Sequence, residues 1–330
     1  MKKSAKIWLI TAGALVLFGG TAFLVLMSAL KWDYKKLSTV KYETNTYEIS
    51  EYISDISILT DTADIVFARS VSGKCKVISF EEKTAENSVT AENGKLIIKT
   101  ENQKSGTDYI GFYFEQPKIT VCLPNSQYNS LQIKRNTGNV KISKDFSFKN
   151  VDINISTGDV DFYSPASESV NIKTSAGSIS VNQASLDTLE LSTSTGTVTV
   201  CGVKCSGDIK INASADRVSL TDITCKRFKS TGDTGDILLK NVIASEKLII
   251  ERDTGNVKFD GCDAAEINVE TDTGDVTGSL LTEKVFIVDS DTGEVDVPKS
   301  ASGGKCEIET DTGNIKIKTN GYKVYASYPR

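Results

Sequence analysis

The stretch Asp253-Thr254-Gly255-Asn256-Val257 decides the fold, because the same signature returns along the second half of the chain. Its glycine recurs at positions 138, 158, 177, 196, 235, 255, 274, 293 and 313. Asp216 stands where one glycine is missing, and Asp is among the few non-glycine residues that tolerate a left-handed backbone. With Asp216 included, ten copies follow one another at intervals of 19 or 20 residues. A fixed period of this length indicates a repeat architecture.

Each copy carries two groups of alternating apolar residues. The first lies two and four residues after the glycine, as in Val160 and Phe162, and the second follows about ten residues later, as in Ile209 and Ile211. Alternation with a period of two is typical of a strand that buries one face. We therefore expect two short strands and two turns in every copy.

A unit of this size cannot bury its own apolar face, so neighbouring copies must stack. A β-solenoid with one copy per coil satisfies this need, and so does a meander of hairpins folded into a sandwich. The constant length favours the solenoid, because in-register coils tolerate no change of length, whereas hairpins vary. The expected fold is all-β: a single-stranded solenoid of the right-handed β-helix type, with 19–20-residue coils. Ten coils would span about 48 Å.

The amino-terminal segment at residues 7–30 contains no charged residue, and Trp8 and Trp32 stand at its two ends. Its length suffices for a transmembrane helix, and interfacial aromatic residues support this reading. A cleaved signal peptide is the alternative, although Met27-Ser28-Ala29 is a poor cleavage site. We expect a single-pass cell-membrane anchor with residues 1–6 in the cytoplasm and the repeat domain outside.

The remaining segments are expected to form a stalk and two caps around the repeats. The predicted ranges are 31–51 for a stalk, 52–134 for a strand and hairpin cap, 135–320 for the solenoid and 321–330 for an aromatic cap. Within the first cap, Asn93-Gly94 indicates a hairpin turn, Ala63 replaces the repeat glycine, and residues 112–114 read as a strand. Both caps would cover open β edges, which otherwise aggregate.

Composition excludes several activities. The 330 residues include no histidine, which removes Ser-His-Asp and Cys-His catalysis and histidine metal sites. The net charge of −5 without a basic cluster argues against nucleic acid as a partner. The triplet Asp-Thr-Gly occurs in aspartic proteases, but those enzymes need two carboxylates sharing a proton, and here it is a periodic turn. We predict no enzyme, no cofactor, and no catalytic or metal-binding residue.

Two repeat positions are rich in oxygen ligands, and stacking would place like charges about 5 Å apart. Solvated aspartates that bond local amides are the expected state, and weak binding of a hard cation such as Ca²⁺ is the alternative. The first position holds Asp233, Asp253, Asp272, Asp291 and Asp311; the second holds Asp236, Asn256, Asp275, Glu294 and Asn314.

Seven cysteines are present, at positions 75, 122, 201, 205, 225, 262 and 306. Cys262 and Cys306 occupy positions otherwise held by Val, Ile or Leu, so they are expected as small core residues. Cys205 and Cys225 would stack on adjacent coils within reach of a disulfide. Cys201 and Cys205 give a weak zinc-like spacing without a second pair. The odd count argues against a disulfide framework.

The order Ile119-Thr120-Val121-Cys122-Leu123-Pro124, then Leu131-Gln132-Ile133, then the repeats, resembles the bacterial family of proposed adhesins built from β-strand repeats. The resemblance covers roughly residues 50 to 320. It implies a β-helix-like fold at the cell envelope, related to the toast-rack domains of envelope-stress membrane proteins, and it supplies no catalytic residue. The seven cysteines and Asp216 depart from the family pattern.

The expected function is that of a non-enzymatic, membrane-anchored, extracytoplasmic binding module or adhesin. Its partner would be a cell-wall polymer, another envelope protein or a host surface. One alternative is an envelope-stress sensor that signals through helix–helix contacts of its single membrane helix. A β-helix carbohydrate-active enzyme is the second alternative, although the arginines are scattered over different coil positions.

Overall fold

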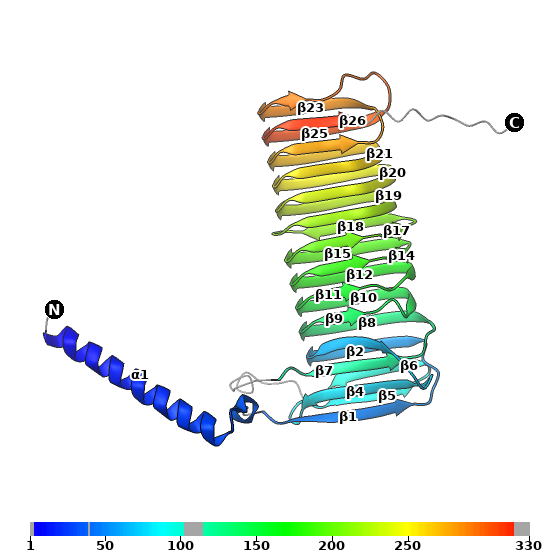
Figure 1. The fold of residues 1–330 in the computed structure, drawn as a ribbon. Coiled ribbons are helices and arrows are strands. Elements are labelled where there is room, and N and C mark those ends of the chain that lie inside the picture. Colours follow the sequence, from blue (N-terminus) through cyan, green and yellow to red (C-terminus); the bar gives the residue numbers. More distant parts are fainter. Residues whose placement is uncertain (1–2, 39, 102–114, 320–330) are drawn as a thin grey trace.

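The computed structural model describes residues 3–38, 40–101 and 115–319, and Figure 1 shows them as one long helix joined to a rod of stacked strands. The strand expected at residues 112–114 and the aromatic cap expected at residues 321–330 lie outside the described residues. The predicted fold class is confirmed: the rod is a β-solenoid with about 20 residues per coil.

Helix α1 (Lys3–Ala29) is followed by the short 3-10 helix η1 (Tyr34–Leu37). Within α1, the 24 residues Lys6–Ala29 reach a mean hydropathy of 2.2, and none of their most apolar window is buried. This length and composition suffice to cross a membrane, and a secretory signal sequence has the same properties. The helix therefore indicates secretion or a single-pass anchor.

The base of the rod consists of seven strands. They are β1 (Tyr42–Ile49), β2 (Asp55–Thr62), β3 (Asp64–Arg69), β4 (Cys75–Glu82), β5 (Asn87–Glu92), β6 (Lys95–Thr100) and β7 (Lys118–Leu123). Strand β1 falls in the second half of the segment expected as a stalk and pairs antiparallel with β4. The Asn93-Gly94 turn joins β5 to β6 with φ values of 53° and 79°, as a two-residue hairpin requires.

The coils above the base combine short and long strands, and in three of the coils these merge into one continuous strand. The strands are β8 (Gln127–Thr137), β9 (Val140–Ile142), β10 (Ser147–Thr157), β11 (Val160–Phe162), β12 (Ala166–Ala176), β13 (Ile179–Asn182), β14 (Ser185–Leu186), β15 (Thr188–Thr195), β16 (Val198–Cys201), β17 (Lys204–Cys205), β18 (Asp208–Ala213), β19 (Val218–Thr234), β20 (Ile237–Thr254), β21 (Val257–Thr273), β22 (Val276–Leu280), β23 (Lys284–Thr292), β24 (Val295–Asp296), β25 (Gly304–Thr312) and β26 (Ile315–Thr319).

Pairing between coils is parallel and in register, which excludes the meander. Val140 lies beside Val160, and Val160 lies beside Ile179, so equivalent residues form columns. The inward side chains of these columns are fully buried, as Phe162, Leu191 and Ile250 show. The alternation seen in the sequence therefore builds one continuous core along the rod.

The turn glycines form a column in which the backbones of neighbouring coils lie very close together. A Cβ added to Gly158 would lie 1.9 Å from the carbonyl oxygen of Gly138, and the same clash recurs up the rod to Gly313 above Gly274. At Gly158, φ is 141°, a backbone region open mainly to glycine. Close stacking of backbone on backbone thus explains the recurrence of glycine at this position better than a left-handed turn.

Asp216 does not adopt the left-handed conformation expected from the sequence, since its φ lies outside the left-handed region. Its carboxylate instead accepts a hydrogen bond of 2.8 Å from the amide of Gly196. In neighbouring coils the equivalent glycine amide donates to a backbone carbonyl, as Gly177 does to Thr195. The Asp216 carboxylate therefore takes the place of the backbone carbonyl that accepts this hydrogen bond in neighbouring coils.

The coil that carries Asp216 is braced by a buried arginine. Arg252 is 3% exposed and donates from Nη1 to the carbonyl of Ala213 (2.5 Å) and from Nη2 to Ser230 Oγ (3.1 Å). It reaches Ala213 through space left by Gly232, where a Cβ would lie 1.9 Å from Nη1. Burial lowers the pKa of Arg252, and Asp233 partly opposes this shift.

The residues that directly follow the repeat glycines form a column of hydrogen bonds between coils. The side-chain oxygen of Asn139 accepts from the amide of Asp159 (2.9 Å), and that of Asn256 accepts from Asp275 (2.9 Å). In spatial order the distal column reads Asp236, Asn256, Asp275, Asn314, Glu294. An amide separates neighbouring carboxylates, so the expectation of like charges in contact is wrong for this column.

The last two coils are stacked out of chain order. Strand β25 lies between β21 and β23, and β26 lies between β22 and β24. The carboxyl-terminal coil is thus inserted below the coil that precedes it in the sequence, as the upper end of the rod in Figure 1 shows. At the base, β2 is likewise inserted between β6 and β8. The repeat pattern alone contained no sign of either exchange.

Candidate functional site

A groove of about 540 Å³ runs along one edge of the rod across several consecutive coils. Its floor is formed where the long strands begin, by Ala166, Leu186 and Cys205. The equivalent residues closer to the base are Tyr128 and Phe148. Side chains smaller than these aromatic ones therefore leave room for the hollow.

Hydroxyl groups line the sides of the groove above this apolar floor. They come from successive coils, and Lys204 and Asp187 add one charge of each sign; the serines are Ser147, Ser167, Ser185 and Ser206. Ser206 donates to Asp187 Oδ1 at 2.6 Å. An apolar floor with spaced hydroxyls can hold an elongated ligand through packing and hydrogen bonds.

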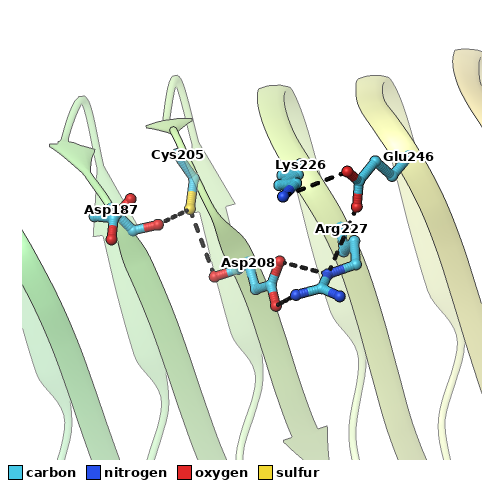
Figure 2. Close-up of polar contacts among 6 residues, drawn as sticks. All are labelled: Asp187, Cys205, Asp208, Lys226, Arg227 and Glu246. Atoms are coloured by element: carbon cyan, nitrogen blue, oxygen red, sulfur yellow. Dashed lines mark hydrogen bonds and ion pairs between the residues drawn. The ribbon is translucent and has the colours of Figure 1, made fainter.

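An ionic ladder continues from the distal end of the groove, as Figure 2 shows. Arg227 on β19 donates two hydrogen bonds to Asp208 at the start of β18, at 2.9 and 2.7 Å. Lys226 and Arg227 both lie near Glu246 on β20, at 3.4 and 3.9 Å. Further along, Lys247 pairs with Glu266 at 2.9 Å. Ion pairs thus link successive coils along this edge.

We expect Arg227→Gln to raise the pKa of the Asp208 carboxyl toward its ordinary value near 4. In the native protein the hydrogen bonds and charge of Arg227 hold that pKa low. Because the folded-state pKa is lowered, the pair stabilises the fold above the ordinary pKa and loses this effect as pH falls. NMR titration of the Asp208 carboxyl carbon measures the shift, with Lys229→Gln as control. An unchanged midpoint would show that Arg227 does not set the pKa.

The groove thiol has the properties of a protonated structural group. Cys205 Sγ lies 2.9 Å from the carbonyl of Asp187, to which it donates, and 3.5 Å from that of Asp208 (Figure 2). Burial raises the pKa of Cys205 to about 11 and that of Cys225 to about 12. The thiolate is the nucleophilic form of cysteine, so neither residue is set up for nucleophilic catalysis.

We expect the alkylation rates of the cysteines to follow their exposure to solvent. We expect Cys205 and Cys225 to resist iodoacetamide at pH 8 in the native state, because their high pKa keeps the thiols protonated. The half-buried Cys122 and Cys201 should react first. Peptide mass spectrometry with and without denaturant reads the order. Rapid native alkylation of Cys205 would contradict this account.

All seven cysteines are free, so the Cys205–Cys225 disulfide is not formed here. Cys262 and Cys306 are fully buried, which confirms them as core residues. The five aspartates of the first column are exposed. No group of three or more Cys, Asp or Glu side chains within the described ranges converges as metal ligands.

No site residue was predicted from the sequence, and neither the groove nor the ionic ladder was expected. The ladder could have been found by aligning the coils on their turns, because Asp208, Arg227 and Lys247 each lie eight residues before the next repeat position. The groove could not be found in this way. Phe148 lies 10 residues after Gly138 and Ala166 lies 8 residues after Gly158, and the two share a column only through a shift of register between β10 and β12.

The fold and groove define a β-solenoid scaffold without a recognisable catalytic centre in its described part. The family profile described as Toastrack DUF4097 matches residues 53–213 and 203–328. The chain belongs to this family. No curated protein matches it.

Several solved structures resemble the chain. A proposed adhesin from Bacteroides fragilis is 14% identical, with a TM-score of 0.39, covering 84% of this chain and 97% of that one. A proposed lipid-binding protein from Parabacteroides distasonis is 15% identical, with a TM-score of 0.43 and the same coverage. A proposed adhesin from Parabacteroides merdae is 9% identical, with a TM-score of 0.41, covering 84% and 96%. At these identities and TM-scores the three proteins carry no inference about function.

Proposed function

We propose that the protein is a non-enzymatic binding module held at the outer face of the cell membrane by α1. The groove carries this proposal, because it offers an apolar floor and hydroxyls along the rod but no activated acid, base or nucleophile. The exposed apolar helix, joined to the base through η1, supports a tethered rod. A cell-wall polysaccharide is the ligand class that fits best, since sugar rings pack on apolar surfaces and donate to hydroxyls.

Binding is tested with the full chain in detergent micelles and soluble cell-wall glycan fragments. Ser185→Trp places a large side chain at the groove while sparing the core, because Ser185 is exposed. Ser175→Trp, at the far end of the adjoining long strand β12, is the matched control. We expect the first variant alone to lose binding, measured by calorimetry. Equal affinity in both variants, or no affinity in the native chain, would refute the groove as the site.

Anchoring is tested separately, by the mass of the mature protein and its extraction from membranes. A retained α1 gives the full mass and resistance to alkaline carbonate. Cleavage near Ala29 with release into the medium would refute the tether and leave the groove proposal standing.

A further inference from the structure

The distal end of the rod leaves its apolar core open. Among the described residues, β23 pairs only with β25 and β24 only with β26. Val295 is 43% exposed, whereas Ile315 and Val276, the next residues down its column, are fully buried. Phe286, Val288 and Val297 are likewise only partly buried against the core. The end coil therefore presents both an unpaired edge and uncovered side chains.

The base of the rod ends differently. There, β4 pairs with β7 and β1 pairs with β4, while β5 pairs with β6. The edge strand β1 has the sequence YETNTYEI and is mostly polar. Solenoids need covers at their ends because an open end is a template for aggregation. The distal end differs from the base in the apolar side chains that it leaves uncovered, which indicates that something covers it.

We propose that residues 320–330 of this chain dock on the distal end of the rod and form its cap. The exchange of the last two coils supports this occupant. It makes β26, which ends at Thr319, part of the coil directly beneath β24. The eleven residues that follow reach about 36 Å when extended. That length is enough to cross the end coil.

The chemistry of the segment matches the surface. Tyr322, Val324, Tyr325 and Tyr328 supply apolar area for Val295 and Val288, and Asn320-Gly321 is a turn signal directly after β26. The end coil exposes Asp289, Asp291 and Asp296. The segment carries Lys323 and Arg330 and no acidic side chain. A second copy docked end to end would instead bring these carboxylates together.

Covering this edge also controls what else can bind there. A free edge strand accepts an extended segment of another protein through backbone hydrogen bonds. With residues 320–330 in place, the most distal surface of the rod is closed to such partners. This inference does not depend on the groove.

Hydrogen exchange on the full chain and on a variant that stops after Thr319 tests the cap. We expect amides of residues 284–297 to exchange at least about tenfold faster in the truncated variant, while β19 and β20 stay unchanged. Tyr322→Ser with Val324→Ser and Tyr325→Ser should act like the truncation. Identical exchange in all three proteins would overturn the proposal.

A second measurement avoids truncation. A photoreactive benzoylphenylalanine in place of Tyr325 should crosslink to residues 284–297 of the same molecule. Crosslinks to another copy, with protection that rises with protein concentration, would assign the edge to a second copy instead. Crosslinks to a different protein, or to none of these residues, would equally overturn the cap.

Discussion

Replacing Gly158 by alanine is expected to destabilise the rod by at least about 4 kcal/mol, beyond what most single substitutions cost. The added Cβ would lie 1.9 Å from the carbonyl oxygen of Gly138. That neighbour is backbone, held in register by β8, β10 and β12, so it cannot move aside cheaply. The free energy of unfolding, from urea denaturation followed by circular dichroism, measures the effect.

Gly202→Ala is the matched control, because it separates the steric clash from backbone strain. Gly202 has φ of 64°, yet the nearest atom to an added Cβ lies 3.7 Å away. Only the strain of a left-handed alanine remains, about 1 to 2 kcal/mol. If the two variants lost equal stability, the close stacking of the glycine column would not be the reason for the repeat glycine.

Lys284→Met is expected to cost about 3 kcal/mol or more, because it leaves a largely buried carboxylate without its partner. Lys284 Nζ lies 2.5 Å from Asp263 Oδ1 and donates to the carbonyl of Ala264 at 2.7 Å. The lysine lies on β23, the acid on β21, and β25 is inserted between these strands. The ion pair therefore links β23 to β21 across the inserted strand β25. Urea denaturation of the variant measures the loss.

Adding Asp263→Asn to Lys284→Met should restore part of the stability, since no unpaired charge then remains. Lys316→Met is the control, because Lys316 and its partner Glu294 are both exposed, and we expect no measurable change. A small effect of Lys284→Met alone would mean that this ion pair does not hold the inserted coil.

The sequence was sufficient for the repeat, the solenoid and the buried columns, because all three follow from glycine spacing and alternation. The hairpin at Asn93-Gly94 was also predictable, because this dipeptide favours the positive φ values of a two-residue turn. The conformation of Asp216 was not, since its carboxylate finds a partner in another coil. The groove was hidden because it depends on which residues share a column.

The exchange of the last two coils could not be predicted from the repeat, since each coil fits either order by length and pattern. Its determinants are contacts across coils. In chain order Asp275 would lie beside Glu294, whereas the observed order places Asn314 between them. The exchanged order also brings Lys284 to Ala264 across Gly304, which lacks a side chain in the way.

Electron spin resonance distances test the stacked and exchanged coils most directly. One label on Ser156 is paired in turn with labels on Asp253, Asp311 and Asp291, all exposed and in one column. Spin-labelled non-canonical amino acids leave the native cysteines untouched. At about 4.8 Å per coil, we expect backbone separations near 24, 34 and 38 Å. A shorter distance to Asp291 than to Asp311, or distances that do not grow along the column, would contradict the account.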